Sequence, residues 1–304
     1  MDRRKFLAGV PGAVVASREV LSGELETVRE PSSLLADPPG PPVSSPIELL
    51  GVQLYTLRQE MASAPERTLA AIAEIGYREV ELAGLYGMTP REMRSKLDDV
   101  GLRAVSSHHG VGDIRGAWAR TLEGAQELGQ SLIVAPSIPG SERTAEGLRR
   151  IADDFNHAGQ TAAEAGLRFG YHNHDWEFGP LPDGTVPMDL LLEKTSPDLV
   201  DWQMDIFWIV DGGESPARYL DGTSGRVTSV HVKDRTPGGE MVDVGDGVID
   251  FSLLLASAER HGMRHAFVEH DRPADAIDSV RRSFQHLTRP AAGSGAQSTG
   301  PGRP

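Results

Sequence analysis

The sequence contains no cysteine among its 304 residues. Disulfide bonds and thiolate metal ligands are therefore both excluded. A metal ion in this protein would have to be bound by His, Asp and Glu side chains. That ligand set suits Mn²⁺, Co²⁺, Mg²⁺ or Zn²⁺, and it excludes a structural zinc site of the cysteine type.

Positive charge is also scarce, because 30 Lys and Arg residues stand against 44 Asp and Glu residues. The formal net charge of −14 disfavours a nucleic-acid partner, whose phosphates most of the surface would repel. The apolar stretch at residues 6–16 is too short to span a membrane, so we expect no stable membrane anchor. No Gly-rich phosphate loop follows the first strand-like run, which argues against a doubly wound nucleotide-binding sheet.

The two ends of the chain differ in composition from its middle. Residues Asp2–Ala8 resemble the start of a twin-arginine export signal, and we expect residues 1–17 to form it, a chance basic N-terminus being the alternative. Residues 18–46 are expected to be a Pro-rich linker, residues 47–288 the catalytic domain, and residues 289–304 a disordered tail. The signal predicts an exported protein, periplasmic or extracellular.

Strand-like and helix-like patterns alternate through the middle of the chain. The expected strands are Leu50–Tyr55, Tyr77–Leu82, Leu102–Ser107, Ser131–Ala135, Leu167–Gly170, Leu199–Met204, Arg226–Val230 and Ala266–Val268. Helical spacing lies between them, for example over Arg58–Ile75, Arg115–Leu128 and Ala145–Ala165, and a glycine usually ends the helix. Eight strands alternating with helices predict an α/β fold, a (β/α)₈ TIM barrel, with a doubly wound sheet as the alternative.

Residues of the types that commonly bind metal ions follow several of these expected strands. His172 and His174 come after the fifth, and Asp205, His231 and Glu269 follow the sixth, seventh and eighth. All strands of a parallel barrel point their C-terminal ends at one face, so these side chains are expected to meet. A lone Asp in an apolar run is also costly unless it is paired or metal-bound, although Asp205 could instead cap a helix. The pattern predicts a metal-dependent enzyme.

Other polar or aromatic residues near the strand ends are candidates for contacts with a substrate. Either of His172 and His174 could be a hydrogen-bonded structural residue instead of a functional one. Lys233 could polarise a carbonyl group, or form a salt bridge with Asp234 or another carboxylate. The further substrate-binding candidates are Glu81, His108, His109 and Trp208, with Gln53 as a minor one. For Glu81 a salt bridge to Arg103 or another neighbour is the alternative, and for Trp208 it is ordinary packing.

Six short segments, taken together in their order, resemble the sugar phosphate isomerase/epimerase family, the TIM barrels related to xylose isomerase. They are Gly51–Leu57, Tyr171–His174, Met204–Trp208, Val230–Asp234, Gly245–Gly247 and Val268–Asp271. The resemblance covers about residues 50–271 and implies this barrel fold and a sugar-like substrate.

The resemblance also implies one divalent ion, held by a carboxylate from the fifth strand, Asp from the sixth, His from the seventh and Glu from the eighth. In this chain the last three are Asp205, His231 and Glu269, and His172 falls at the fifth position in place of the carboxylate. Whether His172, His174 or Glu177 fills that position stays open. Because the fifth-strand Glu of related isomerases is also an acid/base catalyst, its replacement leaves a two-carboxylate proton shuttle in doubt.

We therefore expect an enzyme that abstracts a proton next to the carbonyl of a small sugar or keto-sugar through a metal-stabilised enediolate. His174, Lys233 and Glu269 are the expected catalytic residues. Isomerisation or epimerisation is the leading outcome, and elimination from 3-keto-glycosides by a lyase is the alternative. A non-catalytic sugar-binding protein is a third hypothesis, and an endonuclease is disfavoured by the charge. An oligomer is compatible with all of these.

Overall fold

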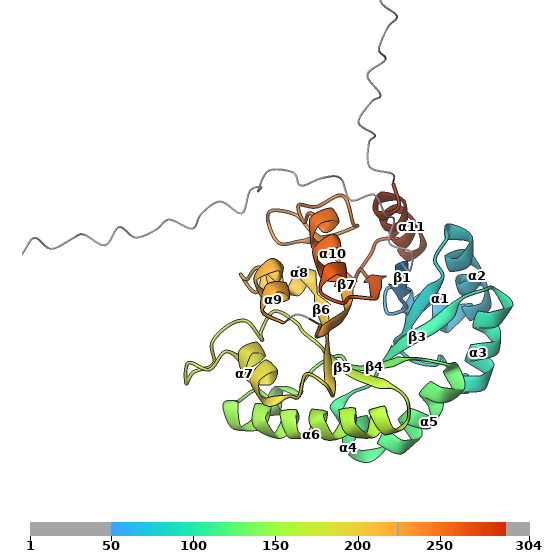
Figure 1. Ribbon diagram of the computed structural model, residues 1–304. Helices are drawn as coiled ribbons and strands as arrows, with labels where there is room; N and C mark the ends of the chain where they lie inside the picture. Colours follow the sequence, from blue (N-terminus) through green and yellow to red (C-terminus); the bar gives the residue numbers. More distant parts are fainter. Residues whose placement is uncertain (1–49, 224, 290–304) are drawn as a thin grey trace, which may run out of the picture. The chain divides into compact units, whose positions relative to one another are not determined.

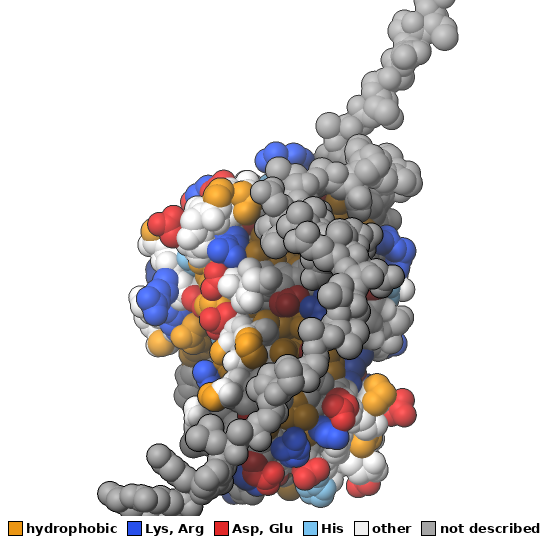
Figure 2. Space-filling model, turned by 90° about the vertical axis from the view of Figure 1, so that its left-hand side faces the viewer, with side chains coloured by type: hydrophobic (Ala, Val, Ile, Leu, Met, Phe, Trp, Pro, Cys, Tyr) orange, Lys and Arg blue, Asp and Glu red, His pale blue; other side chains and the backbone are white. Residues whose placement is uncertain are grey.

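The computed structural model describes residues 50–223 and 225–289. The predicted export signal and Pro-rich linker lie outside the described residues, as does nearly all of the predicted tail. Within the described residues, no helix combines the length and the apolar character that crossing a membrane would need. On the face shown in Figure 2, acidic and basic side chains are intermingled over the described surface, as on an ordinary solvated domain.

Eight parallel strands close into a barrel, in agreement with the predicted fold. They are β1 (Leu50–Gln53), β2 (Glu79–Leu82), β3 (Arg103–His108), β4 (Leu132–Ala135), β5 (Arg168–His172), β6 (Val200–Asp205), β7 (Val227–Val232) and β10 (His265–Val268). The barrel closes where β1 pairs with β10. A short antiparallel pair, β8 (Asp234–Arg235) and β9 (Met241–Val242), follows β7.

Helices surround the barrel and cover the outer faces of its strands (Figure 1). They are α1 (Arg58–Ser63), α2 (Pro65–Ile75), α3 (Pro90–Asp99), α4 (Val111–Gly116), α5 (Trp118–Leu128), α6 (Ala145–Glu164), α7 (Pro187–Lys194), α8 (Ile206–Asp211), α9 (Pro216–Gly222), α10 (Phe251–Arg260) and α11 (Ala276–Leu287). A single 3₁₀ turn, η1 (Gly140–Glu142), precedes α6. Each helix packs an apolar stripe on the strands, as where Phe155 of α6 meets Phe169 of β5 with 5.3 Å between ring centroids.

Two helices expected to be continuous are each broken in the structure. The segment Arg58–Ile75 divides at Ala64, because Pro65 has no N–H group and is favoured only at the start of a helix, where it begins α2. The segment Arg115–Leu128 belongs to α4 and α5, which meet at Ala117, whose φ of −141° is not helical. Neither break moves the strands that carry the candidate site.

Several strands extend further toward their C-terminal ends than the apolar runs predict. β5, β6 and β7 end at His172, Asp205 and Val232. The polar residues are paired like their apolar neighbours, with Asp205 opposite His231 and His172 opposite Gln203. His172, Asp205 and His231 therefore sit on the strands themselves, and this fixes their positions, whereas Glu269 directly follows β10.

Candidate metal centre at the barrel mouth

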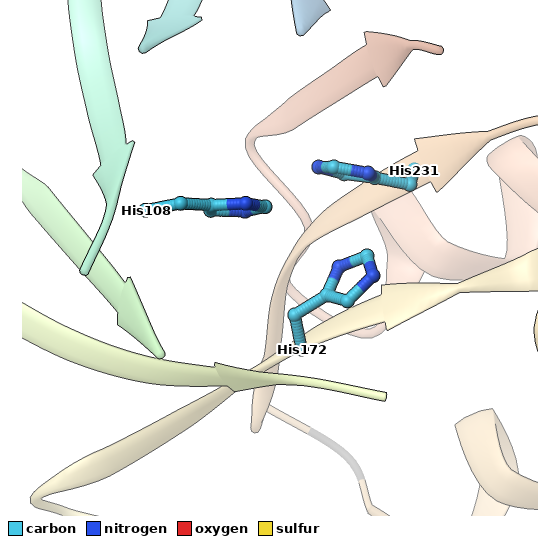
Figure 3. Close-up of side chains that lie close together, drawn as sticks. All are labelled: His108, His172 and His231. Atoms are coloured by element: carbon cyan, nitrogen blue, oxygen red, sulfur yellow. The ribbon is translucent and has the colours of Figure 1, made fainter. Parts of the chain in front are cut away.

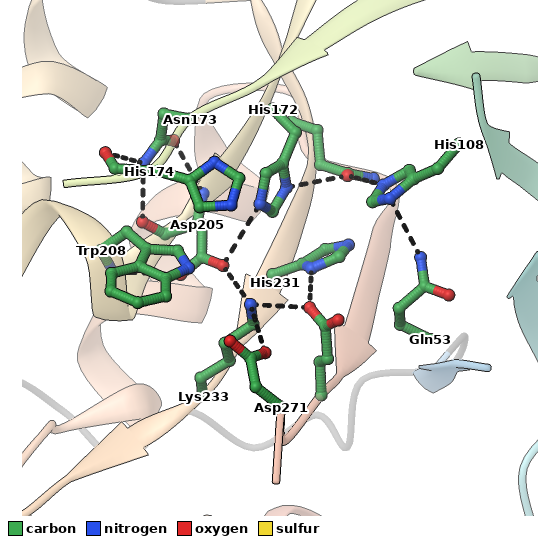
Figure 4. A network of polar contacts seen from close by, with 12 residues as sticks. Gln53, His108, His172, Asn173, His174, Asp205, Trp208, His231, Lys233 and Asp271 are labelled. Carbon is green, nitrogen blue, oxygen red and sulfur yellow. Dashed lines mark hydrogen bonds and ion pairs between the residues drawn. The ribbon is translucent and has the colours of Figure 1, made fainter. Parts of the chain in front are cut away.

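Four expected metal ligands come together at the C-terminal ends of β5, β6, β7 and β10. His172, Asp205, His231 and Glu269 are all buried. Figure 4 shows the side chains of His172, Asp205 and His231 close together. Ligand atoms of Asp205, His231 and Glu269 all lie within 4.8 Å of one another. The Nε2 atom of His172 is 3.5 Å from the Oδ2 atom of Asp205. Strands far apart in sequence thus place one imidazole or carboxylate each around a common point.

Asp205 caps a helix with one carboxylate oxygen and can bind a cation with the other, the two roles considered for it from the sequence. Its Oδ1 atom accepts a hydrogen bond from the backbone N–H of Trp208 at 3.1 Å and caps α8. Its Oδ2 atom is buried and forms no hydrogen bond of good geometry within the described structure. Burial raises the pKa of this carboxyl group above its usual value, against the attraction of Lys233 and His231. One oxygen therefore supports the helix while the other remains available to a cation.

The ammonium group of Lys233 lies among the same carboxylates. Its Nζ atom is 2.8 Å from Oε2 of Glu269, 3.0 Å from Oδ2 of Asp205 and 3.1 Å from Oδ1 of Asp271. Burial alone would lower the pKa of Lys233, but these three carboxylates raise it well above the usual value. Lys233 is consequently charged, and its partners are these carboxylates and not Asp234.

His231 and Glu269 form a second charged contact. The Nδ1 atom of His231 is 2.7 Å from Oε2 of Glu269, and its Nε2 atom is 2.6 Å from Oε1 of Glu81. Burial by itself would lower the pKa of His231, but the two carboxylates raise it to about 10. Burial would raise the pKa of Glu269, yet Lys233 and His231 lower it below its usual range.

The residues present fit a divalent ion. Buried oxygen and nitrogen donors without sulfur are the ligands that Zn²⁺, Mn²⁺ and Co²⁺ accept in proteins. Asp205 supplies an oxygen without a well-formed hydrogen bond. Three carboxylates, those of Asp205, Glu269 and Asp271, surround Lys233, and the carboxylates of Glu81 and Glu269 contact His231. These four carboxylates outnumber the two cationic side chains, so a metal cation would offset negative charge that is costly to bury.

His108 is partly buried and lies beside two of the expected metal ligands. It stands beside His172 and His231 (Figure 3), and nitrogen atoms of the three imidazoles all lie within 4.8 Å of one another. The Nε2 atom of His108 is 2.9 Å from Oε1 of Gln203 and 3.0 Å from Oε1 of Glu81. His231 therefore belongs to two overlapping groups of potential ligands.

Glu81 is held by side chains from several neighbouring strands. Its side chain is fully buried, and Gln53 donates to its Oε1 atom at 2.7 Å, beside His231 and His108. Gln203 donates to Oε2 at 2.7 Å, and Ser106 donates to the same oxygen. Burial would raise the pKa of Glu81, but His108 and His231 hold it well below the usual value. Glu81 thus forms its ion pairs with His231 and His108, the other neighbours that the alternative allowed, whereas Arg103 pairs with Glu79. A contact between Glu81 and substrate stays a prediction.

His109 is not brought into the group either. Its Nε2 atom is 3.1 Å from the hydroxyl group of Ser107, and its Nδ1 atom is 3.7 Å from Asp113. Because successive residues leave a strand on opposite sides, His108 and His109 at the end of β3 point to different places. Only the first of the two predicted histidines joins the site.

His174 and Trp208 lie side by side next to the ligand group, with 5.5 Å between their ring centroids (Figure 4). The Nδ1 atom of His174 and the Nε1 atom of Trp208 are buried and have no hydrogen-bond partner among the described residues. Burial lowers the pKa of His174 to about 4, so its ring is neutral at neutral pH. These two nitrogen atoms are suited to hydrogen bonds with a polar ligand.

Glu177 does not enter the ligand group. It is fully buried, accepts a hydrogen bond from the hydroxyl group of Tyr171, and accepts another from the backbone N–H of His174 at 2.9 Å. Burial raises the pKa of Glu177 to about 7, against the effect of these two donors. Of the three candidates for the fifth-strand position, the structure thus brings His172 to Asp205 and uses Glu177 to hold the backbone at His174.

Three residues of the site were missed in the sequence. Gln203 links His108, His172 and Glu81, Asn173 accepts from the backbone N–H of Asp205 at 2.9 Å, and Asp271 pairs with Lys233. Gln203 and Asp271 each lie two residues from a predicted ligand, and a spacing of two puts strand residues on one face. The two-residue spacing from a predicted ligand could therefore have identified Gln203 as a residue of the site.

Asp234 organises the loop that follows β7. Its carboxylate accepts hydrogen bonds from the backbone N–H groups of Arg235, Gly245, Gly247 and Ile249 at 2.8–3.1 Å. A Cβ atom at Gly247 would lie 2.2 Å from Oδ1 of Asp234, so the loop needs glycine there. The Gly245–Gly247 segment is explained by this close approach.

The chain is similar to known proteins over most of its length. An inosose dehydratase from Geobacillus kaustophilus is 27% identical over 232 residues, which cover 63% of this chain and 74% of that enzyme. One from Bacillus anthracis is 35% identical over 142 residues, or 39% of this chain and 46% of that enzyme. The crystal structure of a sugar phosphate isomerase/epimerase from Parabacteroides distasonis superposes with a TM-score of 0.71 at 26% identity, covering 81% of this chain and 96% of that one.

The family model described as xylose isomerase-like TIM barrel matches residues 69–289. That range begins within α2 and includes every residue of the ligand group. The fold and the recognised resemblance are both confirmed by these matches, and the chain belongs to the xylose isomerase-like TIM barrel family.

Proposed function

We propose that this protein is a metal-dependent enzyme that removes a proton next to the carbonyl group of a keto-sugar or keto-cyclitol. The observation that carries the proposal is the buried meeting of His172, Asp205, His231 and Glu269 at the barrel mouth, with the cation of Lys233 beside them. These four residues would hold one divalent ion, Mn²⁺, Co²⁺, Mg²⁺ or Zn²⁺. When bound, the ion supplies a Lewis acid that stabilises the enediolate.

The side chains around the ligand group have distinct parts in this reaction. His174 is neutral, has an unpaired Nδ1 atom and stands at the mouth, so it accepts the proton. The Lys233 ammonium remains charged and stabilises negative charge that develops on the substrate oxygen. Glu269 is ionised, and it holds both His231 and Lys233 in place. Trp208 forms a wall for the substrate ring, and its Nε1–H donates to a hydroxyl group.

We further propose that the enzyme eliminates water from its substrate. His174 takes the α proton, the C–O bond at the β carbon breaks, and the departing hydroxyl group recovers that proton and leaves as water. One acid/base group suffices for this sequence, which suits a site whose fifth-strand position is His172. The naming of the curated relatives as inosose dehydratases supports elimination and suggests a keto-cyclitol as the substrate class.

Isomerisation or epimerisation is the second candidate. The 26% identity to a structure named sugar phosphate isomerase/epimerase, over 81% of this chain, favours it. Both reactions share the first proton transfer, but epimerisation must return a proton to the opposite face of the same carbon. A second acid/base group is then required, and Lys233, whose Nζ atom lies 5.6 Å from the centroid of the Trp208 ring, is the candidate.

The test begins with metal analysis of the purified chain. About one divalent ion per chain, lost in an Asp205→Ala, His231→Ala double variant, would support the site. The loaded protein is then incubated with inosose and 3-keto-glycosides in D₂O. Deuterium at the α carbon reports proton abstraction, loss of one water in the mass spectrum reports elimination, and a new stereoisomer reports epimerisation. Sugar binding with neither metal uptake nor exchange would contradict the proposal and favour a non-catalytic binding protein.

A further inference from the structure

His231 is the one residue shared by the two groups of potential ligands. One group consists of Asp205, His231 and Glu269, and the other of His108, His172 and His231. The two nitrogen atoms of the ring face different partners, since Nδ1 is 2.7 Å from Glu269 and Nε2 is 2.6 Å from Glu81. The partners of these two nitrogen atoms therefore bear on which group His231 can serve.

Glu81 is placed to make that choice. Its Oε1 atom is 2.6 Å from Nε2 of His231 and 3.0 Å from Nε2 of His108, so one oxygen engages both imidazoles. Its Oε2 atom accepts hydrogen bonds from Gln203 and Ser106, which prevents the carboxylate from turning away. The side chain is fully buried on β2 and cannot exchange these partners for water.

We propose that Glu81 is a positioning residue that directs the ion to the group of Asp205, His231 and Glu269, beside His172, and away from His108. It accepts a hydrogen bond from Nε2 of His231 and lies 3.0 Å from Nε2 of His108, which also contacts Gln203, so both Nε2 atoms are engaged and Nδ1 of His231 is presented on the side of Glu269. A histidine ligand needs one nitrogen without a proton, and the partner of the other nitrogen decides which one that is. This inference rests on the proposed metal site and adds how that site is selected.

The experiment compares Glu81→Gln with Glu79→Gln in the full chain. Glu79 is also buried on β2, two residues earlier, but its partners are Arg103 and His265, outside the ligand group. Zn²⁺ affinity is measured by competition with a chelator, and the histidine nitrogens of the Zn²⁺-loaded proteins are observed by ¹⁵N NMR. Glutamine keeps the size of the side chain and removes its charge, so the acceptor for two imidazoles is weakened.

In the unmodified protein, Zn²⁺ should perturb Nδ1 of His231, leave its Nε2 protonated and leave the His108 nitrogens unchanged. Glu81→Gln should bind Zn²⁺ about 10- to 100-fold more weakly, the usual range when a carboxylate behind a ligand histidine is lost. The His108 nitrogens should then respond to the ion. Glu79→Gln should match the unmodified protein in both measurements.

A response of His108 in the unmodified protein would overturn the inference, as would unchanged Zn²⁺ affinity in Glu81→Gln. In either case the proposed function would stand. Failure of the unmodified protein to bind any ion would instead remove the proposed metal site, and the inference with it. If Glu81→Gln does not fold, His108→Asn decides: its Zn²⁺ affinity should equal that of the unmodified protein, and a clear loss would show that His108 is a ligand.

Discussion

The Nζ atom of Lys233 lies 3.0 Å from the Oδ2 atom of Asp205, so a side-chain cation already contacts an expected metal ligand. The same ammonium is 2.8 Å from Glu269. A divalent ion that binds to these two carboxylates must share them with Lys233 or displace it. Metal affinity and the position of this lysine are therefore coupled.

Replacing Lys233 by methionine should tighten metal binding and reduce turnover. Removal of a positive charge a few ångströms from the ion relieves a repulsion worth about 1–3 kcal/mol at a partly screened site, which corresponds to roughly tenfold or more in affinity. The measurement is the dissociation constant for Mn²⁺ or Zn²⁺ by titration calorimetry. Lys194→Met is the control, because Lys194 is exposed and pairs only with Glu193 within the described structure. Weaker binding in Lys233→Met would mean that the lysine orients the ligands and does not compete for them.

Metal ions should stabilise the folded protein in proportion to their occupancy. At a concentration 100 times the dissociation constant, the added stability is about 2.7 kcal/mol, and the melting temperature rises accordingly. The Asp205→Ala, His231→Ala variant should show no such rise in a thermal-shift measurement. An Asp153→Ala, His157→Ala variant is the control, since it removes the same residue types from the exposed face of α6. Equal stabilisation of both variants would place the ion elsewhere.

The stability of the fold should depend on pH through Glu177. Its folded pKa is raised to about 7 from an ordinary value of 4.5, so the folded state favours the protonated form. The resulting stabilisation is fully present below about pH 4.5 and is lost as the pH rises through 7, by at most about 3 kcal/mol. Urea denaturation between pH 4.5 and 8 should show this loss, and Glu177→Gln should lack most of it. Glu123→Gln, on the exposed side of α5, should retain it.

Substitution of Gly247 by alanine should destabilise the loop after β7. The added Cβ atom would meet Oδ1 of Asp234 at 2.2 Å and disturb the hydrogen bonds to Gly245 and Ile249. Overpacking of this kind costs about 1–3 kcal/mol, which urea denaturation can detect. Gly238→Ala is the matched control within the same loop, where the new atom would meet its nearest neighbour at an ordinary 3.6 Å. Equal stability of the two variants would show that the Asp234 contacts are not maintained in solution.

The sequence was sufficient to predict the barrel and the meeting of the ligands at its mouth. Each strand was visible as an apolar run, and the rule that parallel strands end at one face brings Asp205, His231 and Glu269 together. The sequence was not sufficient to predict contacts that depend on the direction in which a side chain points within the barrel. Glu81 is predicted to lie at the strand end and to bind substrate, but its carboxylate contacts five polar side chains of the barrel. These side chains come from four other strands, and the sequence pattern of β2 alone does not reveal such contacts.

Local breaks were also hard to predict from spacing alone. Helical periodicity continues through Ala64 and Ala117, so the divided helices were expected to be single. The proline at the first position of α2 was the one local sign of a break. The partners of Lys233 depended on the loop after β10, whose Asp271 lies next to the lysine only because β10 pairs with β7.

The pairing of β1 with β10 closes the barrel with strands from opposite ends of the described chain. Glu269 directly follows β10, whereas Gln53 and Glu81 belong to β1 and β2. During synthesis the early strands emerge long before the last ligand, and contacts between such distant segments form slowly. Ion capture by the full ligand set must therefore be a late event in maturation, and a bound ion would report that the last strand has docked.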